Sequence, residues 1–239
     1  MPGARLIDFG DLAAAKKAIK KGRTCGVFVE PVQGEGGVRP ADAAFLQGLR
    51  DLCDEAGAYL VFDEVQCGLG RTGKLYAHQH LGVEPDLMTL AKPLAGGLPI
   101  GAVLVSGEVA AAMQPGDHGS TFAANPLCCA AANHVLGRLQ APGFLDEVAA
   151  QGAYLKARLA EELEGHPKVQ EVRGAGLLVG VQCDEAVGPV VAAALDKGLL
   201  VVSAGAGDVL RLVPPLTVTR AEIDRAVGVI KACFLDWTD

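Results

Sequence analysis

The chain has 239 residues, half of them hydrophobic, and 31 are glycine. A chain of this length can bury one sizeable core, or one large and one small core. Its net charge of −7, with no basic block, argues against nucleic acid or an anionic membrane as a partner. The longest apolar run, Pro93 to Gly107, contains Pro99 and four glycines and is too short to span a bilayer.

The seven cysteines are odd in number, and no pair has the spacing of a metal site. Most of them lie inside apolar runs. We therefore predict reduced, buried cysteines that behave as small hydrophobic residues, rather than a disulfide framework. This pattern indicates an intracellular protein.

The first part of the chain alternates apolar strands with amphipathic helices. Asp11 can cap a helix that ends near Gly22, and a nearly continuous apolar strand covers Gly26 to Glu30. Asp42 can cap a second helix that ends at Gly57, and Tyr59 opens the next strand. Strand, helix and strand in this order predict a parallel α/β sheet.

The pattern changes at Pro142-Gly143, so we predict one domain over residues 1–141 and a second over 142–239. Beyond this boundary short strands occur in near-adjacent pairs with flanking helices, which predicts a small α+β domain. We expect helices at 144–164 and 187–197, strands at 169–172, 177–182, 199–202 and 209–213, and a last helix that begins with the capping box Thr219–Glu222.

Two neighbouring strands of the first part end in chemically useful side chains. The strand from Tyr59 to Phe62 runs into Asp63, and the strand from Leu87 to Ala91 ends at Lys92. Such an acid and lysine could hold the two ends of a pyridoxal phosphate ring, because the carboxylate would keep the pyridine nitrogen protonated and the amine would bind the aldehyde. The alternatives are an acidic strand end that faces solvent and an ordinary surface lysine.

The residues directly after Asp63 could assist the same ring. Strand alternation places Asp63 and Val65 on one face, so Val65 would pack on the ring. Gln66, at the strand end, could reach the ring oxygen.

The stretch Gly68 to Leu75 nearly matches a nucleotide-binding loop, GxxxxGK[ST], but three features argue against it. Leu75 stands where a magnesium-binding hydroxyl is needed. The acidic strand runs directly into the loop instead of lying downstream, and no long helix follows Lys74 to face a phosphate. His78 and His80 have no third ligand nearby, so we interpret them as solvated and expect no metal site. The absence of a G-x-S-x-G motif gives no support to a serine hydrolase.

Three further polar features have two interpretations each. Arg211 lies in an apolar strand and needs a partner or an anionic ligand. Glu35 lies far from it in sequence, in a glycine-rich loop, so the two could serve a ligand or form a structural ion pair. Ser120 and Thr121, in a glycine-flanked loop, offer hydroxyls to a phosphate but also suit a plain turn.

Taken together, six motifs resemble those of the class III, pyridoxal-phosphate-dependent aminotransferases, in the family's order and over nearly the whole chain. They are Glu30–Gly37, Phe62–Gln66, Gly68–Gly73, Ala91–Gly97, His118–Phe122 and Leu210–Pro215. The resemblance implies fold type I, with a mainly parallel sheet in a large domain, a small C-terminal α+β domain and a homodimer that shares its active sites.

The resemblance also implies roles for residues that contact the cofactor, pyridoxal 5'-phosphate. Lys92 would bind it covalently, and Asp63 would pair with its ring nitrogen. Val65 would pack on the ring and Gln66 would bond its phenolic oxygen, with Glu64 among the contacting residues.

Other roles implied by the resemblance concern the phosphate and the substrate. Thr121 would bind the phosphate of the neighbouring subunit's cofactor, and Ser120 would lie near the substrate. Glu35 and Arg211 would form a pair near the carboxylate end of the amino-acid substrate.

Within the family the chain is most similar to the acetylornithine aminotransferases. This implies transfer of the δ-amino group of N2-acetylornithine to 2-oxoglutarate in arginine biosynthesis. The alternatives are an ornithine or 4-aminobutyrate aminotransferase, or a non-catalytic fragment. The stretch Lys92 to Gly101 resembles plant or algal members of the family, which implies that the protein is located in a plastid or a mitochondrion. If the protein is not of plant or algal type, we expect it in the cytoplasm. The family's N-terminal part has no counterpart here, so we expect the chain to be a piece of a longer protein.

Overall fold

The structure, a computed structural model, describes residues 3–237 and forms two compact units. Unit 1 contains the described residues up to 31 together with 41–69 and 78–138. Unit 2 contains 32–40, 70–77 and the described residues from 139 onward. Each unit has its own four-stranded sheet, so each can be described by itself.

The sheet of unit 1 is parallel except at one edge. Its strand order is β1 (Gly26–Val29), β4 (Tyr59–Asp63), β5 (Leu87–Leu90) and β6 (Ala102–Val105). The first three strands run parallel and β6 runs antiparallel to β5. The predicted α/β class is therefore confirmed, and the carboxyl ends of β4 and β5 meet at the same edge of the sheet.

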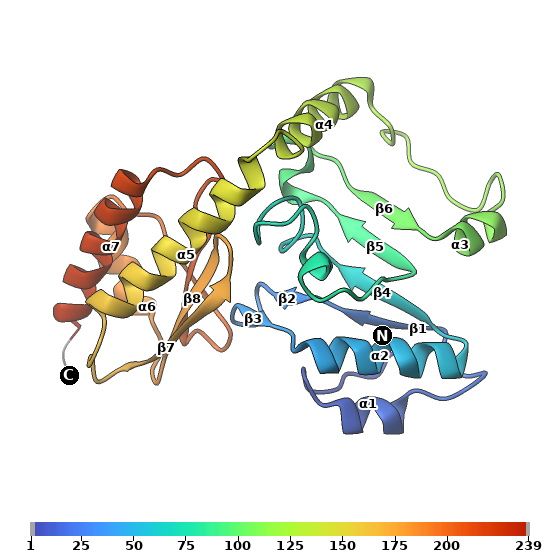
Figure 1. Cartoon of the computed structure of the whole chain (residues 1–239), viewed down its shortest axis with the longest axis horizontal. Coiled ribbons are helices and arrows are strands. Elements are labelled where there is room, and N and C mark those ends of the chain that lie inside the picture. Colours follow the sequence, from blue (N-terminus) through green and yellow to red (C-terminus); the bar gives the residue numbers. More distant parts are fainter. Residues whose placement is uncertain (1–2, 238–239) are drawn as a thin grey trace. The chain divides into compact units, whose positions relative to one another are not determined.

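Two helices cover one face of this sheet (Figure 1): α1 (Leu12–Ala18) and α2 (Ala43–Ala56). The predicted caps are confirmed, since Asp11 accepts a hydrogen bond from Ala14 N at 2.8 Å and Asp42 accepts one from Ala44 N at 2.7 Å. The apolar stripe of α2 packs on the inward side chains of β4, and the buried core includes Phe45, Leu46, Leu49, Leu60 and Phe62. Helix α1 is shorter than predicted and ends at Ala18.

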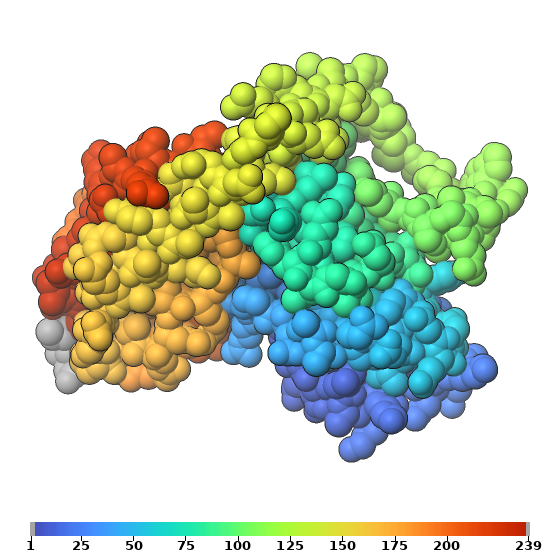
Figure 2. Space-filling model, in the orientation of Figure 1, coloured from blue at the N-terminus to red at the C-terminus, as the bar shows by residue number. Residues whose placement is uncertain are grey.

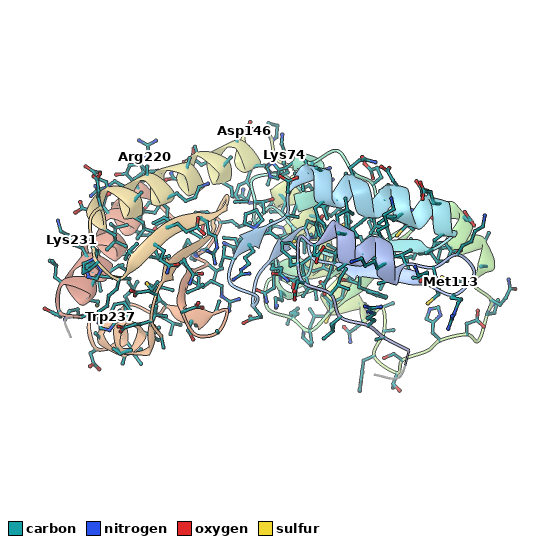
Figure 3. All side chains as sticks on the ribbon, turned by 90° about the horizontal axis from the view of Figure 1, so that it is seen from below. Lys74, Met113, Asp146, Arg220, Lys231 and Trp237 are labelled. Carbon is teal, nitrogen blue, oxygen red and sulfur yellow. The ribbon has the colours of Figure 1, made fainter. Side chains whose placement is uncertain are left out.

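The remainder of unit 1 follows β4 and β5. Its elements are the 3₁₀ turns η1 (Ala77–His80), whose first residue belongs to unit 2, and η2 (Lys92–Ala95). They also include the helices α3 (Gly107–Ala112) and α4 (Pro126–Leu139), and the last residue of α4 belongs to unit 2. Asn125 caps α4, accepting from Leu127 N at 3.0 Å. Figure 2 shows the segment between α3 and α4 standing away from the rest of unit 1, and Met113, labelled in Figure 3, lies in it. All residues from 111 to 127 are exposed.

Unit 2 has an antiparallel sheet in the order β7 (Val169–Ala175), β8 (Leu178–Cys183), β10 (Val209–Leu212) and β9 (Val202–Ala204). Helices α5 (Phe144–Glu162), α6 (Gly188–Asp196) and α7 (Arg220–Leu235) complete it, and the predicted capping box begins α7. Strand β9 starts three residues later than predicted. Leu155, Leu159, Val181, Leu210 and Ile230 lie in its core, which joins α5 and α7 to the sheet.

Two segments from the first part of the chain also belong to unit 2. The first forms a short hairpin of β2 (Val32–Gln33) and β3 (Arg39–Pro40), and Val38 between them is fully buried. A Cβ added at Gly180 of β8 would lie 2.9 Å from Val38 Cβ, so glycine is needed for this approach. Residues 139–237 thus make up most of unit 2, but the unit is not contiguous in sequence.

The second segment, residues 70–77, meets α5 and the β7–β8 turn backbone to backbone. A Cβ at Gly152 of α5 would lie 2.2 Å from the carbonyl carbon of Gly176, and one at Gly176 would lie 2.5 Å from that of Thr72. Arg71 Nη1 donates to Pro214 O at 2.6 Å and to Leu177 O at 3.2 Å. Burial lowers the pKa of Arg71 to about 10. The segment, whose Lys74 is labelled in Figure 3, is therefore fixed by both packing and hydrogen bonds.

The remaining chemical features of the described chain are simple. All seven cysteines are free and five are buried; burial raises the pKa of Cys53 to about 11 and that of Cys183 to about 12. No described helix has the length and apolar character needed to cross a membrane. The described residues contain no cluster of His, Cys, Asp and Glu that could hold a metal ion.

Candidate active site

Asp63 lies at the carboxyl end of β4 and is held by two donors. The register pairs it with Thr89 of β5, whose hydroxyl donates to Asp63 Oδ1 at 3.1 Å. The backbone N–H of Val65 donates to the same oxygen at 3.0 Å. Within residues 3–237 both hydrogen bonds to this carboxylate end on Oδ1, which leaves Oδ2 available to a cation.

Lys92 lies two residues after the end of β5, three residues beyond Thr89, and has an unusual backbone. Its φ of 44° lies in the left-handed region, which is rare for a side chain other than glycine. Such strain costs on the order of 1–3 kcal/mol and is concentrated at functional sites. Lys92 is exposed, and η2 ends at Ala95, followed by Gly96 with φ 62°. The structure thus brings Asp63 and Lys92 to the same edge on neighbouring parallel strands.

Glu64 points into the interior, away from the face that Asp63 occupies. It is 0 % exposed, and its Oε1 accepts from His78 N at 3.0 Å and lies 2.7 Å from His78 Nδ1. The prediction that His78 is solvated is wrong, because the residue is buried and its ring lies 5.9 Å from that of Phe62. Glu64 therefore closes the turn between β4 and η1, and its contact with a cofactor stays a prediction.

The turn after Asp63 also contains Val65 and Gln66, both half-buried. Gly68 N donates to Glu64 O at 2.9 Å, and a Cβ at Gly68 would lie 2.9 Å from Glu64 Oε2. A glycine is therefore required at position 68 for the chain to fold back over Glu64. The turn keeps Val65 and Gln66 next to the Asp63 carboxylate.

Ser120 and Thr121 lie in the exposed segment between α3 and α4. Ala123 N donates to Ser120 O at 3.2 Å, which makes a turn. Among the residues that the structure describes, no hydrogen bond joins this pair to Asp63 or Lys92. The structure therefore does not bring the two hydroxyls together with the strand ends.

Glu35 and Arg211 are brought together in unit 2. Arg211 Nη1 donates to Glu35 Oε1 at 2.8 Å, across 176 positions of sequence. Arg211, in the buried strand β10, is itself buried, whereas the Glu35 side chain is 68 % exposed. The pair therefore joins an exposed carboxylate to a buried guanidinium.

The predictions from sequence missed three residues whose hydrogen bonds hold parts of the two units in place. Thr89 could have been found by placing the two strands in register, since it lies opposite Asp63. Arg71 was considered only as part of a nucleotide-binding loop and of the family motif Gly68–Gly73, with no role of its own. Arg173 bonds the loop of Glu35 over 136 positions, and no local pattern indicates such a contact.

The strand-end residues fit pyridoxal phosphate in their chemistry. The second oxygen of Asp63 suits a protonated ring nitrogen, and Lys92 supplies a primary amine for an aldehyde. The chain belongs to the class III aminotransferase family, whose model matches residues 9–234.

Curated relatives within this family include acetylornithine aminotransferases. The mitochondrial enzyme of that name from Alnus glutinosa is 53% identical over 98% of this chain and 52% of its own length. Acetylornithine aminotransferase 1 of Bradyrhizobium diazoefficiens is 52% identical over 98% of this chain and 58% of its own. The chain thus spans a little over half the length of these relatives.

Solved structures share this fold over almost the whole chain. N-acetylornithine aminotransferase from Stenotrophomonas maltophilia matches with a TM-score of 0.87 and 37% identity, covering 98% of this chain and 62% of that one. Ornithine aminotransferase from Toxoplasma gondii matches with a TM-score of 0.92 and 38% identity, covering 99% and 57%. Fold type I is therefore confirmed.

Proposed function

We propose that this chain is part of a pyridoxal-phosphate-dependent acetylornithine aminotransferase of arginine biosynthesis. The reaction converts N2-acetylornithine and 2-oxoglutarate to N-acetylglutamate semialdehyde and glutamate. The observation that supports it most is the placement of Asp63 and Lys92 at the carboxyl ends of neighbouring parallel strands. The identity of 53% to an acetylornithine aminotransferase supports the choice of substrate.

Pyridoxal phosphate, when bound, supplies an aldehyde and a pyridine ring that accepts electrons from the substrate carbon. Asp63, fixed through Oδ1 by Thr89 and Val65, holds a proton on the ring nitrogen with its other oxygen. Lys92 would supply the primary amine that holds the aldehyde and, when it is not bound there, the base that would move the proton at the substrate carbon. Val65 packs on the ring and Gln66 bonds its phenolic oxygen.

Glu35 and Arg211 let one site accept two different substrates. The donor presents a distal amine, whereas 2-oxoglutarate has a carboxylate beside its reacting carbon. An arginine without Glu35 beside it would favour the substrate with the adjacent carboxylate in both half-reactions. Glu35, 2.8 Å from Arg211, covers the positive charge when the amine donor binds and moves away from it when 2-oxoglutarate binds. The Glu35 side chain is 68 % exposed, which permits this movement.

Thr121 and Ser120 complete the proposal at a subunit boundary. Thr121 binds the phosphate of the neighbouring subunit's cofactor in a homodimer, and Ser120 lies near the substrate. Their exposure in this chain is consistent with groups that act on another subunit. A mitochondrial relative supports an organellar location.

Reductive trapping tests the role of Lys92. In the holoenzyme that contains this chain, borohydride should attach the cofactor to the peptide with Lys92. Lys92→Ala should retain cofactor but lose turnover by at least about a hundredfold, since positioned acid–base groups contribute factors of 10²–10⁴. Lys74→Ala, which removes another exposed lysine of the chain, is the matched control and should leave labelling unchanged. Labelling of another lysine would refute the assignment.

Half-reaction kinetics test the role of Glu35. In Glu35→Ala, Arg211 loses the carboxylate that accepts from it at 2.8 Å, so glutamate should become a better amino donor relative to acetylornithine. A charge-assisted hydrogen bond contributes roughly 1.5–3 kcal/mol, so the ratio of the two kcat/KM values should shift by about tenfold or more. An unchanged ratio would mean that the pair is purely structural.

An ornithine aminotransferase is the second candidate, because the Toxoplasma gondii enzyme of that name has a TM-score of 0.92 with this chain. The same half-reaction experiment separates the two. A kcat/KM for ornithine above that for acetylornithine would favour the second candidate and would leave the roles of Asp63 and Lys92 unchanged.

A further inference from the structure

We propose that Arg173 is a positioning residue that keeps Glu35 beside Arg211 and so sets the substrate preference of the pair. Arg173 acts through the backbone of the loop that carries Glu35. The inference rests on the proposed function of Glu35 and Arg211. All of the residues concerned lie in unit 2.

The guanidinium of Arg173 binds two consecutive carbonyls of the loop. Its Nη2 donates to Gly37 O at 2.6 Å, and its Nε donates to Gly37 O at 3.1 Å and to Val38 O at 3.0 Å. Gly37 has a φ of 105°, a conformation that only glycine adopts readily. A planar guanidinium is rigid, so these bonds fix both the position and the orientation of the carbonyls.

The same guanidinium is anchored on its other side within the sheet. Arg173 Nη2 donates to Gln182 Oε1 at 2.8 Å, and Gln182 Nε2 donates to Asp208 Oδ2 at 2.9 Å. Asp208 Oδ1 in turn accepts from Ala206 N at 3.1 Å. Gln182 is buried, and its hydrogen bond lowers the pKa of Asp208. Arg173 is thus held by a continuous chain of hydrogen bonds that ends in a carboxylate.

The loop transmits this position to Glu35. Its turn is closed by Val38 N and Gly37 N, which donate to Gly34 O at 3.3 and 3.4 Å. The carbonyl of Glu35 accepts from Gly205 N at 2.8 Å. The backbone of Glu35 is therefore fixed while its side chain stays largely exposed. Arg173 thus fixes the backbone of the loop from which the Glu35 side chain extends, and it does not restrain the carboxylate itself.

A less rigid backbone in the loop of Glu35 should weaken the contact between Glu35 and Arg211 without removing either group. The positive charge would then be available more often, so the preference should shift in the same direction as in Glu35→Ala but by less. A residue that only stabilises the fold would lower stability and leave the preference unchanged. The substrate ratio therefore separates a positioning role from a structural one.

The central experiment measures the ratio of kcat/KM for glutamate to that for acetylornithine in holoenzyme with Arg173→Lys. Lysine keeps the charge but cannot bind two carbonyls in a fixed plane, so we expect a shift on the order of threefold towards glutamate. Glu171→Gln is the matched control. It removes the exposed ion pair at the outer side of the same guanidinium and should leave the ratio unchanged.

A double-mutant cycle decides whether Arg173 acts through Glu35. In a Glu35→Ala background, Arg173→Lys should cause no further change in the ratio, because the group that it positions is absent. An additional shift of the same size would overturn the proposal. If Arg173→Lys fails to fold, Asp208→Asn provides the test, since it releases Gln182 from the far end of the chain of bonds. It should shift the ratio in the same direction, about twofold.

Hydrogen exchange in the 239-residue chain gives a readout that needs no catalysis. The amide of Gly205, bonded to the Glu35 carbonyl, should exchange at least about threefold faster in Arg173→Lys than in Glu171→Gln. Equal rates would overturn the positioning role. If Glu35→Ala itself leaves the substrate ratio unchanged, the proposed function of the pair fails, while this exchange still decides whether Arg173 holds the loop.

Discussion

In unit 1 the candidate residues Asp63 and Lys92 are placed by backbone register, whereas in unit 2 Glu35 is placed by side chains that bind backbone carbonyls. The parallel pairing of β4 with β5 alone brings the two strand ends of unit 1 to one edge. The loop of Glu35 depends instead on Arg173 and on the glycine at position 37.

This difference affects how each part responds to substitution. Register is set by many backbone hydrogen bonds and by a buried apolar face, so single side-chain changes in unit 1 should leave the strand ends in place. Unit 2 contains close backbone approaches and a chain of polar contacts. A substitution that introduces one methyl group or one amide there should therefore lower the stability measurably. Substitutions in each unit test this difference.

The largest expected effect is at Gly152, where α5 meets Gly176. A Cβ there would lie 2.2 Å from backbone that cannot give way, so Gly152→Ala should lower the free energy of unfolding by about 3 kcal/mol. Gly228→Ala is the matched control, because Gly228 lies in α7 with nothing within 4 Å of the added Cβ. It should raise stability by up to about 1 kcal/mol. Urea denaturation of both variants measures the contrast, and the same sign for both would contradict it.

A second expected effect is at His78, a tightly bonded side chain beside the β4 turn in unit 1. His78→Phe keeps a ring of similar size but removes the group 2.7 Å from Glu64 Oε1. Since Glu64 is buried, the loss should cost about 2 kcal/mol in urea denaturation. His134→Phe, on the exposed surface of α4, should stay within about 0.5 kcal/mol of the parent. Equal losses in the two variants would show that the bond to Glu64 does not stabilise the turn.

The smallest expected effect is at Asp208 and depends on pH. In Asp208→Asn an amide nitrogen would face either Gln182 Nε2 or Ala206 N, so one hydrogen bond should be lost, at a cost of about 1 kcal/mol at roughly pH 6. The bond from Gln182 lowers the pKa of Asp208 below its usual 3.8. The stabilisation is therefore present above pH 3.8 and is lost as the pH falls through the lowered pKa.

Urea denaturation of the parent and of Asp208→Asn between about pH 3 and 7 measures this dependence. The difference between their free energies of unfolding should be constant from about pH 5 to 7 and should shrink below about pH 4. A difference that grows towards low pH would contradict the assigned direction of the pKa shift.

Local patterns predicted much of unit 1. Buried parallel strands appear as apolar runs, so the ends of β4 and β5 could be placed, and with them Asp63 and Lys92. Asp42 could be placed as a cap because capping depends on residues within one turn of helix. The burial of His78 could not be predicted, because its partner Glu64 lies 14 positions away across an irregular turn.

Long-range contacts limited the prediction of unit 2. The strands and the capping box of residues 139–237 follow from local periodicity and hydrogen bonding. The attachment of 32–40 and 70–77 to them depends on shape, on glycines that allow two backbones to touch, and on arginines that bind carbonyls. Sequence spacing contains no information about such contacts.

The discontinuity of unit 2 has a consequence for synthesis on the ribosome. Gly37 is made 136 residues before Arg173, the side chain that binds its carbonyl. At about 5–20 residues per second, the hairpin of β2 and β3 waits on the order of ten seconds for its partner. Val38, fully buried in the finished fold, stays exposed during that time. Nascent chains should therefore be most vulnerable to chaperone binding and proteolysis in residues 32–40, until β7 and β8 have emerged.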